Sequence, residues 1–226
     1  MQRRTHLSPI ILLAGALVLS SCGGSSQAGT QSSPTAPTQS AGNVQPTAAL
    51  RATAEPSTTA AATPEQAVAP EQNPAGDIPD TQVFVRYVAS GGFSLEVPEG
   101  WGRSTSGSDV RFVEKLDGVQ VAISNTASAP TAESVRTHEA VALAQSGRAV
   151  TVSDITEVKL PSGPAVLIVY TSNSDPNPVT NKQVRLEDNQ YLFFNDGKLA
   201  TLTLWAPQGA DNVDQWQRIA QSFRWQ

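Results

Sequence analysis

Alternating hydrophobic and polar positions begin only at residue 83, and from there they predict a chain rich in β-strands. Three hairpins are expected, joining 83–89 to 93–97, 110–116 to 119–125, and 183–194 to 198–206. Their turns are predicted at Gly91-Gly92, at Asp117-Gly118 as a type I′ turn, and at Asn195-Asp196-Gly197. The stretch 102–107 is also rich in Gly and Ser, and it is expected to form turns.

Between the second and third hairpins the pattern predicts a helix and two further strands. The helix runs over 132–146, with Thr131 near its start and Gly147 at its end. Strands follow at 150–160 and 165–171. The second is apolar without alternation, which is typical of a central strand buried on both faces.

The C-terminal pattern changes to a helical period. Five apolar residues share one face of a helix expected over 211–222: Val213, Trp216, Ile219, Ala220 and Phe223. Asp211 is the expected N-cap. The predicted fold class is α+β, an antiparallel sheet sandwiched by helices.

All 13 aromatic residues lie at or after Phe84, so the first 83 residues lack the material of an ordinary core. One folded domain is therefore expected over 81–226. The preceding segment, 22–80, holds eight prolines among Ala, Thr, Ser and Gln. Such a composition predicts a disordered tether. It is either a passive spacer or a stalk that lifts the domain from a membrane, and its glycosylation stays open.

Residues 1–21 have the pattern of a secretory signal peptide. Arg3 and Arg4 precede an apolar run over 10–19, which is about half the length that a membrane-spanning helix needs. The alternative is an uncleaved membrane anchor. Leu19-Ser20-Ser21-Cys22 resembles the lipobox of bacterial lipoproteins.

The lipobox resemblance implies that Cys22 is acylated and becomes the mature N-terminus. Several acyl chains on one residue give stable membrane anchoring. The next residue is Gly23 rather than the Asp that resembles an inner-membrane retention signal. The expected location is extracytoplasmic, on the outer membrane of a two-membrane cell or the outer leaflet of the plasma membrane otherwise.

The predicted domain resembles PsbP-like domains at both of its ends. Gly92-Phe-Ser-Leu-Glu-Val-Pro-Glu-Gly-Trp101 is similar to their opening strand, and Thr203-Leu-Trp-Ala-Pro207 followed by a helix ending Ser222-Phe223-Arg224 is similar to their close. The resemblance implies an antiparallel sheet between helices. It also implies a protein-binding role, because most members bind other proteins and they share no catalytic motif.

Candidate chemistry is sparse in the mature chain. Once Cys22 is acylated and His6 removed, His138 is the only histidine left, and it sits among polar neighbours of the predicted helix. No Gly-x-Ser-x-Gly elbow accompanies it. In a strand the doublet Glu187-Asp188 would point to opposite faces and so could not act as a carboxylate pair. The alternative is that it marks a bulge or turn before Asn189. We expect no catalytic residues, no metal site and no cofactor.

The loop over 173–181 is rich in oxygen ligands, including Asp175 and Asn177, but it lacks calcium-loop spacing. It is interpreted as a surface loop, with a weak cation site as the alternative. Residues 81–226 carry 12 Lys and Arg against 15 Asp and Glu, so a nucleic-acid partner is not expected.

The four tryptophans are mostly core candidates. Trp205 would share a strand face with Thr201 and Thr203 rather than with the neighbouring leucines, so it is expected either to pack in the core or under a helix, or to line a binding patch. The candidate binding surface therefore comprises Trp101, Trp205, Asp175 and Asn177. The expected function is a lipid-anchored accessory module that binds an envelope protein. The alternatives are a small-molecule or lipid carrier and, third, a hydrolase. The partner, the ligand, the membrane and the oligomeric state are not specified by the sequence.

Overall fold

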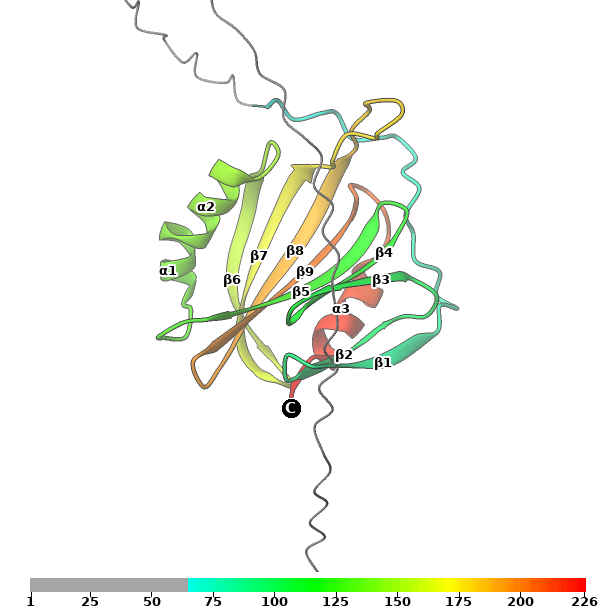
Figure 1. The fold of residues 1–226 in the computed structure, drawn as a ribbon. Coiled ribbons are helices and arrows are strands. Elements are labelled where there is room, and N and C mark those ends of the chain that lie inside the picture. The colour runs from blue at the N-terminus through cyan, green and yellow to red at the C-terminus, as the bar shows by residue number, and fades with distance from the viewer. Residues whose placement is uncertain (1–64) are drawn as a thin grey trace, which may run out of the picture. The chain divides into compact units, whose positions relative to one another are not determined.

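The computed structural model describes residues 65–226 (Figure 1). The predicted signal peptide, Cys22 and most of the predicted tether lie outside these residues. Within the described part of the chain, no helix is both long enough and apolar enough to cross a membrane.

Two antiparallel sheets form the folded unit (Figure 1). In spatial order the large sheet contains β3 (Gly102–Ser106), β4 (Asp109–Glu114), β5 (Asp117–Asn125), β9 (Lys198–Pro207), β8 (Arg185–Asn195), β7 (Gly163–Asn173) and β6 (Thr151–Leu160). The small sheet contains β1 (Phe84–Ala89), β2 (Phe93–Pro98) and β10 (Arg224–Trp225).

Helices cover both faces of the large sheet, which confirms the predicted α+β sandwich. On one face α1 (Ala132–Thr137) and α2 (Glu139–Ser146) pack against β6 and β7, where Val135 joins Ile168 and Leu192 in a buried cluster (Figure 1). On the other face α3 (Val213–Ser222) and the small sheet enclose the larger cluster. The helical period of the sequence thus buries one stripe of each helix against the sheet, and the strand alternation buries alternate side chains on its two faces.

Three stacked phenylalanines join the layers of the larger cluster. The ring centroid of Phe193 on β8 lies 4.3 Å from that of Phe223, which follows α3. The Phe223 ring lies in turn 5.8 Å from that of Phe93 on β2. All three side chains are almost fully buried, so they link the large sheet, the end of α3 and the small sheet.

The second predicted hairpin exists, but its turn was misplaced. Asp117 and Gly118 belong to β5, where they pair with Glu114 and Val113 of β4. The turn is made instead by Lys115, whose φ is 53°, and Leu116. The expected turns at 102–107 were also wrong, because Gly102–Ser106 forms the edge strand β3.

Three smaller expectations need correction. The helix expected over 132–146 is divided into α1 and α2 at His138, although Thr131 does cap its start. Asn212 rather than Asp211 is the N-cap of α3, because the helix begins at Val213, and the Asn212 side chain bonds to Ile78 instead of capping the helix. The apolar strand β7 lies next to the edge strand β6 and not at the centre, which β9 occupies.

Residues 65–80, which we name the strap, pack against the folded unit, which the sequence predicted to begin at residue 81. Ile78 is buried in the larger cluster, and its backbone N–H donates to Asn212 Oδ1. The backbone N–H of Val68 donates to Asn173 Oδ1. Despite its prolines and lack of periodic pattern, this segment is held by long-range contacts that propensity does not report.

Candidate binding cleft around Trp205

Trp205 lies on β9 with Gly118 and Asp188 as its direct cross-strand neighbours. Directly paired residues of antiparallel strands project on the same face, so all three belong to the face that carries α1 and α2. The indole is only 9% exposed, yet it belongs to neither hydrophobic cluster. Trp205 is therefore a buried aromatic residue set apart from the core.

The indole is held between a glycine and an arginine. A Cβ atom on Gly118 would lie 1.8 Å from Trp205 Cζ2, so only the absence of a side chain there leaves room for the ring. From the other side the guanidinium carbon of Arg111 lies 4.5 Å from the ring centroid. Arg111 is itself exposed, and the stacked pair presents a cation over an aromatic platform.

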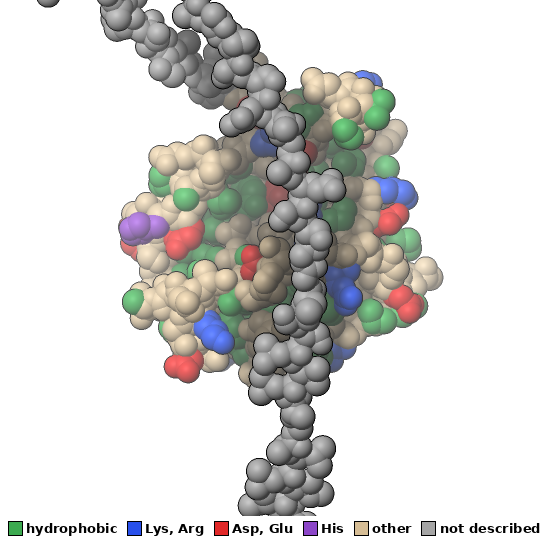
Figure 2. All heavy atoms as spheres, viewed as in Figure 1, with side chains coloured by type: hydrophobic (Ala, Val, Ile, Leu, Met, Phe, Trp, Pro, Cys, Tyr) green, Lys and Arg blue, Asp and Glu red, His purple; other side chains and the backbone are tan. Residues whose placement is uncertain are grey.

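A cleft of about 290 Å³ opens beside this stacked pair. It is lined by Arg111, Val113, Lys115, Leu116, Asn173, Ser174, Asp175, Leu186, Asp188 and Trp205. Both charge signs and an aromatic ring are thus available to a ligand. On the face shown in Figure 2, acidic and basic side chains are interspersed rather than gathered by sign.

Asp188 lies in the wall of this cleft. Its side chain is 5% exposed, and its Oδ2 accepts a hydrogen bond from Ser172 Oγ at 2.7 Å. Burial raises the pKa of Asp188 to about 7, against the opposing effects of the Ser172 hydrogen bond and the Arg185 charge. Near neutral pH the carboxyl can therefore act as a donor or as an acceptor.

The rim of the cleft is fixed by a polar network. Arg185 donates to Asn173 Oδ1 and to the carbonyl oxygen of Ala149. Asn173 Nδ2 donates to Glu65 of the strap. This hydrogen bond and that from Gln183 lower the pKa of Glu65. The first described residue of the strap is thus bound to a residue that lines the cleft.

The structure brings together two of the four residues that the sequence proposed for a binding surface. Trp205 and Asp175 line this cleft. Asn177 lies beyond it, where its Oδ1 accepts from the backbone N–H groups of Val179 and Thr180 and closes a turn. Trp101 lines a separate pocket of about 410 Å³ beside the strap.

Sequence reasoning missed Arg111, Gly118 and Asp188 as parts of one site. Gly118 was interpreted as a turn residue, and nothing local distinguishes it from one. The Glu187-Asp188 doublet was correctly expected to face opposite sides of a strand: Asp188 lines this cleft, while Glu187 lines a cavity on the other face. The alternation of β8 predicts that Asp188 and Glu187 face opposite sides of the sheet, but it does not show that Arg111 and Trp205 lie beside Asp188.

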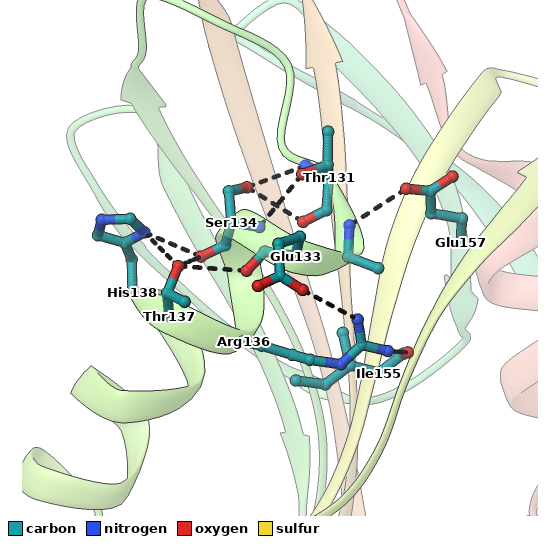
Figure 3. A network of polar contacts seen from close by, with 9 residues as sticks. Thr131, Glu133, Ser134, Arg136, Thr137, His138, Ile155 and Glu157 are labelled. Carbon is teal, nitrogen blue, oxygen red and sulfur yellow. Dashed lines mark hydrogen bonds and ion pairs between the residues drawn. The ribbon is translucent and has the colours of Figure 1, made fainter.

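His138 lies at the junction of α1 and α2 (Figure 3), and it is not among the residues that line the cleft. Its Nδ1 is 2.9 Å from the carbonyl oxygen of Ser134 and 3.0 Å from Thr137 Oγ1. Thr137 Oγ1 in turn approaches the carbonyl oxygens of Glu133 and Ser134. These contacts are those of a helix end, and they place His138 in a structural network rather than in a nucleophilic arrangement.

Groups of three or more His, Cys, Asp or Glu residues able to hold a metal ion are absent from residues 65–226. The cleft instead offers an aromatic ring, a guanidinium, an ammonium and a carboxyl of raised pKa. This set suits recognition by stacking and hydrogen bonding.

No protein-family model and no curated protein sequence matches the chain. Among solved structures, the chain is similar to cyanobacterial PsbP (CyanoP) from Synechocystis sp. PCC 6803, with 19% identity and a TM-score of 0.49. The match covers 67% of this chain and 98% of that one. A Bacteroides thetaiotaomicron protein matches with 9% identity and a TM-score of 0.42, over 62% of this chain and 48% of its own. Likenesses this distant carry no argument about function, and the α+β architecture rests on the chain's own structure.

Proposed function

We propose that this chain is a lipid-anchored, extracytoplasmic accessory protein that binds another envelope protein through the Trp205 cleft and catalyses no reaction. The lipobox resemblance of Leu19–Cys22 and the tether composition support the anchoring. The observation that carries the binding role is the Trp205–Arg111 stack, which lies outside both hydrophobic clusters. The ring lines the cleft together with the exposed Arg111, so a partner that enters the cleft would contact both.

A protein partner suits the composition of this surface. Trp and Arg are the residue types enriched among the few that dominate protein–protein binding energy. The adjacent loop extends the surface, with Val179 90% exposed and the Asp175 side chain 90% exposed beside Arg148. Both signs of charge are present at the rim, which favours a specific polar partner over a uniformly charged polymer.

The test is isolation of the intact lipidated protein from its own membrane under mild extraction, followed by native mass spectrometry. We expect a stoichiometric protein partner with the wild-type chain and its loss with Arg111→Ala. Arg103→Ala is the matched control. Arg103 lies on β3, which pairs with the β4 strand that carries Arg111, and its guanidinium carbon also lies over an aromatic ring, 5.5 Å from the centroid of Tyr87. A partner retained equally by both variants, or absent from the wild-type protein, would contradict the proposal.

A carrier of small molecules is the second candidate function, and one feature supports it. A cavity of about 370 Å³ lies between α3 and the large sheet, on the face opposite Trp205. This volume falls within the range of ligand-binding pockets. A small molecule retained in the same mass spectrum without a protein partner would place this function first.

A further inference from the structure

The cavity beneath α3 has a largely apolar wall. Its floor is formed by Val158 and Leu160 of β6 and Leu167 of β7, all partly exposed. Trp216 and Ala220 of α3 form the opposite side. Apolar side chains left partly open to solvent beside a helix provide a surface that gains free energy when an apolar ligand covers it.

The polar groups of this cavity are unevenly distributed by charge. Glu187 contributes a carboxylate from β8, and Asn189 contributes an amide two residues further along the same strand face. Lys, Arg and His are all absent from the cavity lining. A ligand carboxylate or phosphate would therefore meet an acid and no cation, whereas a ligand cation would meet its complement.

Two aromatic rings reinforce this preference for positive charge. Tyr191 and Trp216 both line the cavity and are largely buried. The faces of aromatic rings attract cations, and the attraction grows when water is excluded. Asn189 Oδ1 is buried without a hydrogen-bond partner among the described residues, so an acceptor in the cavity wall is left for an N–H donor of a ligand.

From this combination we infer that the cavity binds a small amphipathic amine, with its apolar body on the floor formed by β6 and β7 and its ammonium group at Glu187. The inference deepens the carrier function and rests on it. It is independent of protein binding at the Trp205 cleft. Glu187 lines the cavity and Asp188 lines the cleft, and these neighbouring residues of β8 face opposite sides of the sheet.

Two fluorescent probes with the same dansyl group test the charge preference. Dansylcadaverine carries a free ammonium group, and 11-(dansylamino)undecanoic acid carries a carboxylate. Each is titrated into the full chain in mild detergent below its micelle concentration. We expect saturable binding of the cationic probe, with energy transfer from tryptophan because Trp216 lines the cavity, and binding of the anionic probe at least about tenfold weaker.

Two variants locate the site. Glu187→Gln is expected to weaken binding of the cationic probe by at least about tenfold, the loss of one charge-assisted hydrogen bond. Gln217→Trp places a large ring at the mouth of the cavity from an exposed position of α3 and should abolish binding. The matched control is Glu157→Gln, because Glu157 faces the opposite side of the sheet, where it accepts from the backbone N–H of Ala132.

The outcomes separate the inference from the function on which it rests. Binding of the anionic probe with equal or greater affinity would overturn the amine assignment while leaving a carrier. The absence of saturable binding by either probe would overturn both. Binding of the cationic probe that is unaffected by both Glu187→Gln and Gln217→Trp would show that this cavity is not the site.

Discussion

Gly118 and Trp205 are paired residues of β5 and β9, and the space for the indole depends on the missing side chain. Gly118 is thus retained for close approach rather than for a turn. Gly118 thus contributes to the cleft indirectly, by leaving space for the Trp205 ring.

Replacing Gly118 with Ala should displace the indole and destabilise the protein by about 1–3 kcal/mol, the usual cost of overpacking. The control is Gly102→Ala on the edge strand β3, where the nearest atom to a Cβ is the Val113 carbonyl oxygen at 3.4 Å. Urea unfolding of both variants measures the difference. Equal losses of stability would mean that Trp205 does not depend on Gly118.

Asp188 should give the protein a pH-dependent stability opposite to that of most acidic residues. Its folded pKa, about 7, lies above the ordinary value of 3.8, so the folded state binds the proton more tightly. The resulting stabilisation is fully present below pH 4 and is lost as the pH rises through 7. Asp117 on β5 is raised to about 7 by burial as well and adds to the same slope.

Asp188→Asn should therefore be more stable than the wild type at pH 8, by at least about 1 kcal/mol, and similar to it at pH 4. The amide oxygen of Asn still accepts the Ser172 hydrogen bond. Chemical unfolding at the two pH values checks this expectation, with exposed Asp196→Asn in the β8–β9 turn as the control. A constant difference between variant and wild type at both values would contradict it.

At the scale of elements, the strap determines where the folded unit begins. Ile78 is 5% exposed within the larger cluster, so Ile78→Ala should cost about 2–4 kcal/mol by loss of buried surface and formation of a cavity. Val83→Ala, at a position 56% exposed, should change the free energy of unfolding by less than about 0.5 kcal/mol. Thermal or urea unfolding distinguishes the two, and a neutral Ile78→Ala would remove the strap from the cooperative unit.

The sequence predicted most strands, the three hairpins and both helical regions, because each of these buries one periodic face. It failed where a residue's role depends on a distant segment. Gly118 resembles a turn glycine until β9 is placed beside it, and residues 65–80 show no period that could reveal their packing on Asn173 and Asn212. The two-residue strand β10 is likewise defined only by its partner β2.

The same limit applied to the candidate site. The sequence left Trp205 as either a residue packed in the core or under a helix, or part of a binding patch. The structure places it outside both hydrophobic clusters and in the same cleft as Asp175 of the 173–181 segment, and a binding role for either residue stays a prediction. The sequence could not show that Arg111, from a hairpin almost a hundred residues earlier in the chain, completes the stack. Trp101 was grouped with Trp205 by residue type alone, and the structure places it in another pocket.

At the scale of the whole molecule, anchoring and folding should be separable. Cys22→Ala is expected to leave the folded unit intact, because its core lies entirely within residues 78–225, and to release it from the membrane. Membrane fractionation together with the unfolding midpoint of the released protein measures both properties. A variant that stays in the membrane fraction would disprove lipidation at Cys22, and a lowered midpoint would show that the N-terminal segment contributes to stability.

The attachment of the strap also has a mechanical consequence. A pull applied through the N-terminus first meets the contacts of Glu65 with Asn173 and Gln183, then that of Val68, and only later those around Ile78. Contacts arranged in series along a strip yield one after another at low force, unlike a sheet loaded along its strands. Drawn out fully, these sixteen residues span at most about 55 Å, and the length gained is the part of this span that the strap does not already cover. The strap would therefore act as an extensible link that yields before the sheet itself bears any load, whatever holds the N-terminal end of the chain.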